Sequence, residues 1–440
     1  MLAAVAAGLC PLAPAAAGEK GRALIRDAEV ETIIRSYAAP LFTAAGLDPE
    51  AVHIYLIQDD SINAFVAGGM NLFLHTGLII RAENANQLIG VIAHETGHMA
   101  GGHLVLGREA MKSASIESLI ATILGIGAAI AIGQPGAGAV IGGAGQSMTM
   151  ATMLTFTREQ EAAADQAGMT LLDRTHQSAR GMASFLHVLQ KQEELYGVGQ
   201  NPYLRTHPLA RERIESADEH VRISPYSDAE EPPAILAAHR RMVAKLIGFI
   251  DPLERVLQQY PEKDTSIEGR YARAIAYYRA ADLKQAMFVL DGLIVEYPDD
   301  PYFQELKGQI LYENSRARDS IPFYRRAVAL APTQPLLRYG LAQSLIALEL
   351  PAENKEGLHE LEEVVRVEPG MSSAWRLMAV AYGRDNQMAM AALALAEAAA
   401  ARGNKNEARE QADRALQQLP TGSPAWLRAN DILSASPETE

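Results

Sequence analysis

The chain contains 440 residues, of which 48% are hydrophobic and 21% charged, and this length exceeds one ordinary domain. Its formal net charge of -14 repels phosphate backbones, so nucleic acid is not an expected partner. The only cysteine in the sequence is Cys10, which excludes an intramolecular disulfide framework. Two or three domains built around hydrophobic cores are therefore expected.

The N-terminal segment, residues 1–18, has the character of an export signal. Residues 2–12 are apolar, three alanines at positions 15–17 provide the small residues that a signal peptidase needs, and Gly18 begins a polar segment. No Lys or Arg precedes the apolar run, which departs from the usual signal pattern. We interpret residues 1–18 as a signal peptide; the alternatives are a buried N-terminal helix and a start codon placed too late.

Residues 19–250 form the second region, which begins with three segments of strand character. Residues 52–57 are rich in strand formers, while residues 62–66 and 71–74 flank Gly68-Gly69, a pair typical of a hairpin turn. We expect these three segments to form a small antiparallel sheet.

A helix is expected over residues 86–100, where apolar residues follow helical spacing until a pair of glycines. It contains an H-E-x-x-H motif made by His94, Glu95 and His98. Side chains four residues apart lie on the same helix face, so the two imidazoles can converge on one ion. Glu95 can take a proton from the attacking water, and imidazole ligands with an open position suit zinc best. The alternative is a pair of polar histidines on a helix surface.

A catalytic zinc needs a third protein ligand, which the motif itself does not supply. The metzincin spacing would place a histidine at the position of Leu104, and His103 follows a glycine pair that ends the helix. Glu161 is the better candidate, on a helix expected to begin near residue 158. Asp165 shares its face and can accept a hydrogen bond from the second ring nitrogen of a ligand histidine. Composition alone equally allows a solvated charged helix.

Between these two helices lies a segment without charge, residues 118–157. Residues 119–132 are strongly apolar, but this run is shorter than the roughly 20 residues that a membrane span needs. Three interpretations stay open: a mobile lid or plug over a cleft, a buried hairpin of the core, and peripheral contact with a membrane.

Residues 251–265 contain prolines and charges and are interpreted as a linker to a repetitive region, residues 266–434. Prolines recur in this region with a period near 34, as in Pro298 and Pro332. Small and aromatic residues recur at the positions that a tetratricopeptide repeat uses to pack its two helices. We expect about four such repeats, stacked into an α-solenoid with a concave groove; the alternative is a generic helical bundle.

Taken together, these motifs resemble the HtpX/Oma-type family of zinc metallopeptidases. The resemblance covers about residues 30–220 and is carried by His94-Glu95-x-x-His98 followed by Glu161-x-x-Ala164-Asp165. Two further groups match the pattern of the family: Asn63-Ala64-Phe65 ahead of Gly68-Gly69, and Thr206-His207-Pro208 ahead of Arg213. A signal peptide combined with C-terminal tetratricopeptide repeats is similar to the periplasmic BepA-type branch of that family.

The resemblance implies a mainly α fold. It implies an α+β, gluzincin-like peptidase domain over residues 19–250, with a small antiparallel sheet, followed by the α-solenoid. One zinc ion per chain is expected, held by His94, His98 and Glu161, in agreement with the choice of ligands made from the residues themselves.

The resemblance also implies that a strand with Asn63, Ala64 and Phe65 lines the cleft, where an extended substrate could add to the sheet edge through backbone hydrogen bonds. The expected activity is cleavage of unfolded or misassembled envelope and outer-membrane proteins in the periplasm of a Gram-negative bacterium. The outer-membrane assembly machinery would dock on the repeats. The alternatives are a repeat-based adaptor or chaperone with little proteolytic activity, and a membrane-embedded relative of the same family.

His207 is the remaining candidate for a catalytic role. It precedes Pro208, which restricts the local backbone, and we hypothesise that its side chain approaches the zinc. There it would stabilise the oxyanion of the tetrahedral intermediate or occupy the open coordination position at rest. The alternative is a structural loop histidine. Arg213 is expected to pair with a nearby acidic group, without an assigned catalytic role.

Overall fold

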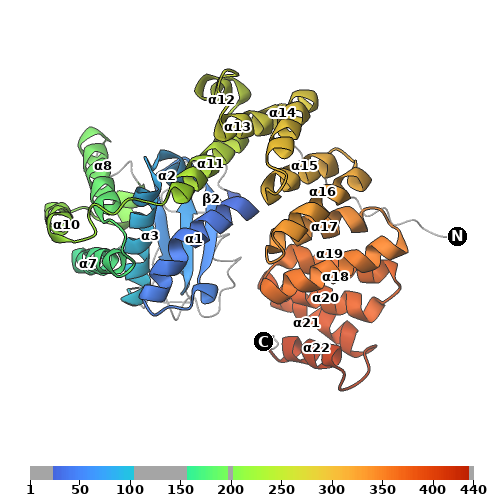
Figure 1. The fold of residues 1–440 in the computed structure, drawn as a ribbon. Helices are drawn as coiled ribbons and strands as arrows, with labels where there is room; N and C mark the ends of the chain where they lie inside the picture. Colours follow the sequence, from blue (N-terminus) through green and yellow to red (C-terminus); the bar gives the residue numbers. More distant parts are fainter. Residues whose placement is uncertain (1–22, 104–155, 197–201, 436–440) are drawn as a thin grey trace.

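The computed structural model describes residues 23–103, 156–196 and 202–435. Within these ranges helices predominate and four strands form one small sheet, which confirms the mainly α fold expected from the sequence. Figure 1 shows the sheet with its helices on one side of the molecule and a stack of helices on the other. The expected signal peptide lies outside the described residues, as does the uncharged segment apart from Phe156 and Thr157.

The four strands pair in the order β1-β2-β4-β3. Their bounds are Ala23–Ile25 for β1, His53–Gln58 for β2, Ala64–Ala67 for β3 and Asn71–His75 for β4. Strands β3 and β4 form the predicted antiparallel hairpin, and Gly68 and Gly69 between them have φ angles of 60° and 97°, which L side chains rarely adopt. Every residue of β3 and β4 is buried, so the hairpin belongs to the core.

The expected antiparallel pairing is wrong for β2 and β4, which run parallel with Ile54 opposite Leu72. The hairpin lies beside β2 in such a way that its second strand, rather than its first, becomes the neighbour of β2. Two reversals of chain direction then give β4 the direction of β2. The alternation of apolar residues within a strand sets neither the order nor the direction of its neighbours. Strand β3 consequently forms an edge of the sheet.

Helix α3 (Ala85–Ala100) lies at the centre of the sheet-containing part and matches the predicted helix. The Asn84 side chain caps its N-terminus by accepting a hydrogen bond from the Gln87 N–H, and Gly101 follows its last residue. Residues 87–98 are all buried, which excludes the alternative of histidines on a solvated helix surface. Helix α3 packs against strand β3 and against α1 (Ala28–Ala44), α7 (Arg158–Arg174) and α8 (Arg180–Tyr196).

Further helices complete the sheet-containing part. None of the helices in the described ranges is long and apolar enough to cross a membrane. These elements are η1 (Pro49–Ala51), α2 (Thr76–Arg81), α9 (Pro202–Thr206), α10 (Arg211–Ile223) and α11 (Pro233–Ile250). Helix α11 also packs against the first helices of the stack, so it links the two parts of the molecule.

From α12 onward the described chain forms the stack of helices in Figure 1. The elements are α12 (Leu253–Gln259), α13 (Ile267–Arg279), α14 (Leu283–Glu296), α15 (Pro301–Glu313), α16 (Ala317–Leu330), α17 (Pro335–Ile346), α18 (Pro351–Val367), α19 (Ser372–Arg384), α20 (Met388–Ala401), α21 (Lys405–Leu416) and α22 (Pro424–Ala435). Each helix from α12 to α22 packs against the next one along the chain. Residues 251–265, expected as a linker, thus contain the helix α12.

Small and aromatic residues meet in this stack. Tyr324 of α16 lies against Gly308 of α15 and Gly340 of α17. A Cβ added at either glycine would lie 2.8 Å or 2.4 Å from the tyrosine ring, so the ring fills the space that the glycines leave. The assignment of these helices to tetratricopeptide repeats stays a prediction.

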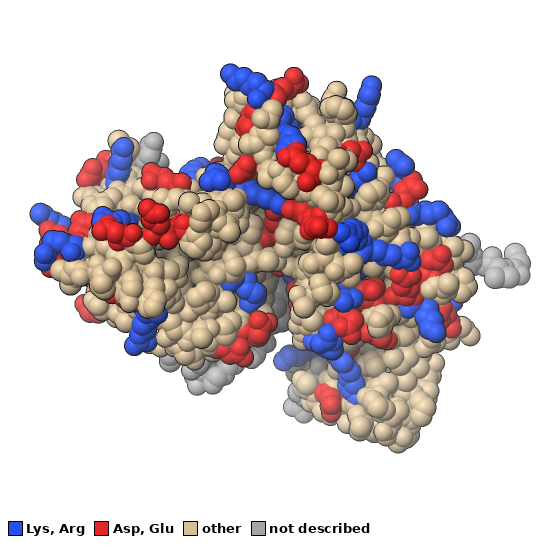
Figure 2. All heavy atoms as spheres, viewed as in Figure 1, with Lys and Arg blue, Asp and Glu red and all other residues tan. Residues whose placement is uncertain are grey.

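The two parts of the molecule meet at the N-terminal turn of α1. Lys245 of α11 is buried, and its Nζ lies 2.8 Å from Asp27 Oδ2, 3.3 Å from Glu29 Oε2 and 3.7 Å from Glu305 Oε2 of α15. Loss of one partner from a buried ion pair leaves an uncompensated charge, so these contacts hold the two parts together. Figure 2 shows basic and acidic side chains interspersed over the visible face rather than gathered by sign.

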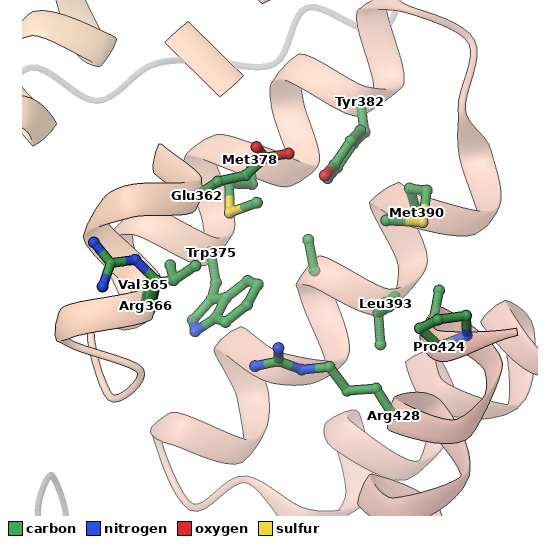
Figure 3. Close-up of a pocket in the computed structure, with 12 residues that line it drawn as sticks. Glu362, Val365, Arg366, Trp375, Met378, Tyr382, Met390, Leu393, Pro424 and Arg428 are labelled. Atoms are coloured by element: carbon green, nitrogen blue, oxygen red, sulfur yellow. The ribbon is translucent and has the colours of Figure 1, made fainter. Parts of the chain in front are cut away.

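A pocket of about 540 Å³ lies between α18, α19, α20 and α22, near the C-terminal end of the stack. Trp375, Met378 and Tyr382 of α19 line it together with Leu393 of α20, and Figure 3 shows how these side chains surround it. Arg428 of α22 lies over the Trp375 ring, 4.8 Å from the ring centroid. The pocket therefore combines an apolar lining with a charged margin, and its volume is that of a typical ligand pocket.

Candidate metal centre

Helices α3 and α7 carry the candidate ligands, and glycines allow the two helices to cross at a very short distance. A Cβ added to Gly97 would lie 2.6 Å from the Ala164 carbonyl oxygen. One added to Gly168 would lie 3.1 Å from the His94 backbone nitrogen. Both distances are shorter than ordinary van der Waals contact, so the two backbones approach each other only where a side chain is missing.

His94, His98, Glu161 and His207 form one buried cluster, in which one ligand atom from each residue lies within 4.8 Å of the others. The Nε2 atoms of His94 and His98 are 3.1 Å apart. Glu161 places Oε1 3.2 Å from His98 Nε2 and Oε2 3.6 Å from His94 Nε2. The structure thus brings together the three residues expected as ligands, which lie far apart in the chain, and adds His207 beside them.

The cluster fits a divalent ion such as zinc. Ligand atoms of a tetrahedral zinc site with bonds of about 2.0–2.1 Å lie roughly 3.3 Å from one another, close to the 3.1, 3.2 and 3.6 Å separations in the cluster. Within the described residues, both carboxylate oxygens of Glu95 and the Nε2 atom of His207 are buried without a hydrogen-bond partner. Buried polar atoms normally have partners, so their absence indicates a site built for an additional group.

Each of the two candidate ligand histidines, His94 and His98, has a neighbour on its second ring nitrogen. Asp165 Oδ1 lies 2.8 Å from His94 Nδ1, and His103 Nδ1 lies 3.0 Å from His98 Nδ1. When His94 donates from Nδ1 to the carboxylate, its Nε2 lone pair stays available for a cation. Asp165 therefore lies where the sequence placed it, while His103 lies beside a ligand rather than inside the cluster.

Burial and mutual contacts shift the pKa values of these residues. Burial, reinforced by the neighbouring histidines, lowers the pKa of His98 to about 2, so its imidazole is neutral. Burial alone would raise the pKa of Glu161, but contacts with His207 and His98 hold it below the usual range. Burial would lower the pKa of His94, but its hydrogen bond with Asp165 and the charge of Glu161 raise it. A metal ion binds the neutral form of imidazole and the ionised form of a carboxylate, so binding would release a proton wherever His94 carries one.

His207 is held among the ligand atoms by three contacts. Its Nδ1 lies 2.9 Å from Glu161 Oε1 and 3.4 Å from His94 Nε2, while its Nε2 lies 3.6 Å from Glu95 Oε1. The ring of Tyr203 stacks on its ring, with 4.4 Å between the centroids. The structure therefore places His207 beside the candidate ligand atoms and Glu95, and the two roles hypothesised for it stay predictions.

Two aromatic residues of the centre, Phe156 and Tyr203, were not predicted from the sequence. The ring of Phe156 stacks on His98, with 3.8 Å between centroids, and its N–H donates to the Thr206 carbonyl at 3.0 Å. Tyr203 precedes His207 by four residues, a spacing that signals proximity on one helix turn. Phe156 carries no such local signal, because its contact with His98 arises only when α7 docks on α3.

Arg213 of α10 has the acidic partners expected for it. It forms ion pairs with Asp165 and with Glu161, and its side chain is buried. His207, which follows α9, and Arg213 of α10 therefore contact the same carboxylate of α7, that of Glu161.

The strand expected to bind substrate is β3, an edge of the sheet that packs against α3. Asn63 directly precedes this strand, Ala64 and Phe65 begin it, and all three residues are buried. Phe65 stacks on Phe73 of β4, with 5.0 Å between centroids. The strand therefore lies beside the helix that carries the H-E-x-x-H motif, and its contact with substrate stays a prediction.

Comparison with known proteins adds an independent line of support. Residues 24–221 match peptidase family M48. The chain is 26% identical over 403 residues to the beta-barrel assembly-enhancing protease of Escherichia coli (strain K12), covering 91% of this chain and 81% of the relative. It is also 26% identical over 390 residues to a putative beta-barrel assembly-enhancing protease of Vibrio cholerae, covering 85% and 77%. Metalloprotease LoiP of Escherichia coli (strain K12) is 27% identical over 168 residues, covering 38% and 61%.

The family match and the geometry agree on the same part of the chain. The matched residues 24–221 contain the sheet, both crossing helices and all four residues of the cluster. The resemblance inferred from motifs is thereby confirmed, and its extent agrees with the expected residues 30–220. The chain is a metallopeptidase, and its residues 24–221 are similar to peptidase family M48.

Proposed function

We propose that the chain is a zinc-dependent endopeptidase that binds one zinc ion through His94, His98 and Glu161. The convergence of two imidazoles and one carboxylate in a single buried cluster carries this proposal. When bound, zinc would supply Lewis-acid polarisation of the scissile carbonyl and of the attacking water. Three protein ligands of this kind are typical of catalytic rather than structural zinc sites.

Glu95 is the proposed general base. It follows His94 on α3 and is fully buried, and this burial raises the pKa of its carboxyl group. A raised pKa increases the affinity of the carboxylate for a proton. Within the described residues neither oxygen of Glu95 has a hydrogen-bond partner, so both can accept. Glu95 takes a proton from the attacking water and returns it to the leaving amine.

The two roles proposed for His207 involve different nitrogens. Its Nδ1 lies among the ligand atoms, which supports occupancy of the fourth position at rest. Its Nε2 faces Glu95, on the side where a donor to the oxyanion is useful. Turnover of the His207→Ala variant separates these roles: an increase supports the resting occupant, a decrease supports oxyanion stabilisation, and no change rejects both.

The substrates that we propose are unfolded or misassembled outer-membrane proteins in the periplasm of a Gram-negative bacterium. The relatives named beta-barrel assembly-enhancing proteases support this proposal. An extended substrate segment would pair with the outer edge of β3, next to Asn63, Ala64 and Phe65, through backbone hydrogen bonds. Such pairing reads the backbone more than the side chains, which suits a broad range of unfolded proteins.

We also propose that the stack from α13 to α22 consists of tetratricopeptide repeats that dock protein partners, including the outer-membrane assembly machinery. The pocket around Trp375 supports this proposal, because it offers an apolar lining that an aliphatic or aromatic side chain of a partner would fill. The repeats would then bind the same protein that the peptidase domain cleaves.

The decisive experiment compares degradation of an unfolded β-barrel outer-membrane protein by the parent and by the Glu95→Gln variant, which keeps the shape of the side chain. Turnover is expected to fall by at least about 10²-fold, while a control variant, Glu159→Gln at an exposed position of α7, is expected to keep parental activity. Equal rates for the parent and Glu95→Gln would exclude this site and favour the adaptor or chaperone alternative. Metal analysis should find one zinc per chain, lost in Glu161→Ala.

A further inference from the structure

Arg213 is a buried arginine at the back of the metal centre, with only 4% of its surface exposed. Its Nε and Nη2 atoms donate to Oδ2 and Oδ1 of Asp165, at 2.5 Å and 2.9 Å, which is a bidentate pair. Its Nη1 atom lies 2.5 Å from Glu161 Oε2. One guanidinium group therefore contacts both carboxylates that α7 presents to the cluster.

The same guanidinium reaches the segment that carries His207. Its Nη1 atom donates to the Pro208 carbonyl oxygen at 3.0 Å. His207 in turn places Nδ1 2.9 Å from Glu161 Oε1. Arg213 thus connects α10, the carboxylates of α7 and the residue after His207 in a single buried network, in which no member can move without breaking a charged contact.

When all three carboxylates of the centre are ionised and its histidines are neutral, their charges balance that of a divalent cation only if Arg213 is counted. Glu95, Glu161 and Asp165 contribute three negative charges when ionised, and a divalent cation supplies two positive charges. Arg213 supplies the third, so the loaded centre is neutral, as a fully buried site requires. Without a cation, Arg213 still holds Glu161 and Asp165 side by side against their mutual repulsion.

We propose that Arg213 is a positioning residue that locks Glu161, Asp165 and the His207 segment into the arrangement that binds the metal ion. The inference rests on the proposed zinc site, and it assigns Arg213 a function that its position in the chain does not reveal. The planar, forked shape of the guanidinium group matters as well as its charge, because the group contacts four separate oxygens of Asp165, Glu161 and Pro208.

Two substitutions separate positioning from charge. Arg213→Gln removes the positive charge, while Arg213→Lys keeps the charge and loses the fork. If Arg213 positions the ligands, both variants bind zinc about 10- to 100-fold more weakly, and Lys restores only part of the loss. If only its charge mattered, Arg213→Gln would bind zinc more tightly, because a positive group near the cation is gone, and that result would overturn the proposal.

The measurement is competition for zinc between the full chain and a chelator of known affinity. The absorption spectrum of the cobalt(II)-substituted protein reports the ligand geometry independently of activity, and it is expected to change in both variants. Arg211→Gln is the matched control, because Arg211 lies on the same helix with 86% of its side chain exposed. An unchanged spectrum and unchanged affinity in both Arg213 variants would refute the positioning role.

A third variant distinguishes loss of ligand positioning from loss of folding. Asp165→Asn combined with Arg213→Gln removes both charges of the buried pair, so most of the stability lost in Arg213→Gln should return. Zinc affinity is expected to stay low, because Glu161 still lacks its partner and His94 no longer faces an ionised carboxylate. Recovery of zinc affinity together with stability would show that Arg213 is merely structural.

Glu161→Ala in the same assay separates this inference from the proposed function. If Glu161→Ala binds zinc as tightly as the parent, the proposed ligand set fails, and the Arg213 inference fails with it. If Glu161→Ala loses zinc while both Arg213 variants keep it, the ligand set stands and the Arg213 inference alone fails.

Discussion

The crossing of α3 and α7 predicts that a single methyl group can disable the centre. In Gly97→Ala the new Cβ would lie 2.6 Å from the Ala164 carbonyl oxygen, against at least 3.4 Å for ordinary contact, so the backbones must separate by about 0.8 Å. Glu161 lies one turn before Ala164, and its Oε1 is now 3.2 Å from His98 Nε2. This separation would move the Glu161 carboxylate too far from His98 for both residues to bind one ion.

The expected cost of Gly97→Ala follows from two separate effects. Overpacking in a well-packed core destabilises by about 1–3 kcal/mol. Displacement of a catalytic group by nearly 1 Å lowers turnover by roughly 10²-fold. We therefore expect weaker zinc binding and a large loss of peptidase activity, together with a lower free energy of unfolding. Denaturant unfolding, chelator competition and degradation of an unfolded protein measure the three quantities.

Two glycines provide graded controls. In Gly168→Ala the nearest contact is 3.1 Å, so the same effects are expected in weaker form. Gly292 lies on α14 with nothing within 4 Å of an added Cβ, so Gly292→Ala should keep activity and gain up to about 1 kcal/mol from helix propensity. If Gly97→Ala behaved like Gly292→Ala, the close crossing of α3 and α7 would not be what assembles the centre.

Three further predictions concern the bound ion and the junction of the two parts. Removal of zinc with a chelator should lower the melting temperature of the parent, because the ion binds the folded state selectively, but not that of Glu161→Ala. Lys245→Met leaves Asp27, Glu29 and Glu305 without their shared cation and should lower the free energy of unfolding by about 3–5 kcal/mol. The control Lys405→Met, at an exposed position, should leave it unchanged. Equal denaturant unfolding curves for the parent and Lys245→Met would show that these contacts do not stabilise the junction. Burial raises the pKa of Glu305 to about 7, above its value in the unfolded chain, so its contribution to stability is present at low pH and is lost as pH rises from about 4.5 to 7. In Glu305→Gln the free energy of unfolding should depend less on pH between about 4.5 and 7. An unchanged slope in this range would show that Glu305 is not the group that titrates there.

The parts of the centre that the sequence predicted are those that local geometry determines. His94 and His98 share a helix face because they are four residues apart, and Asp165 shares a face with Glu161 for the same reason. The Gly68-Gly69 hairpin and the end of α3 before Gly101 are likewise decided by residues that are adjacent in the chain. Each of these features could be read without knowledge of the fold.

Contacts between distant segments could not be read in this way. The parallel pairing of β2 with β4 depends on which strand of the hairpin meets β2, and both alternatives bury similar apolar residues. The stacking of Phe156 on His98 arises only after α7 has docked on α3. The expected linker contains a helix because α12 finds a packing partner in α13.

The sequence by itself determined the chemistry of this protein: two imidazoles and a base on one helix, and a carboxylate pair on another. Only the tertiary structure decided that these groups meet, because Glu161 reaches the histidines across a crossing that Gly97 and Gly168 make short enough. It also decided the partners of Arg213, since the sequence does not say which acidic groups an arginine in a charged helix will meet. The physical reason is that burial and close packing depend on contacts between different helices and strands. The residue pattern of one helix or strand shows only which of its faces is apolar.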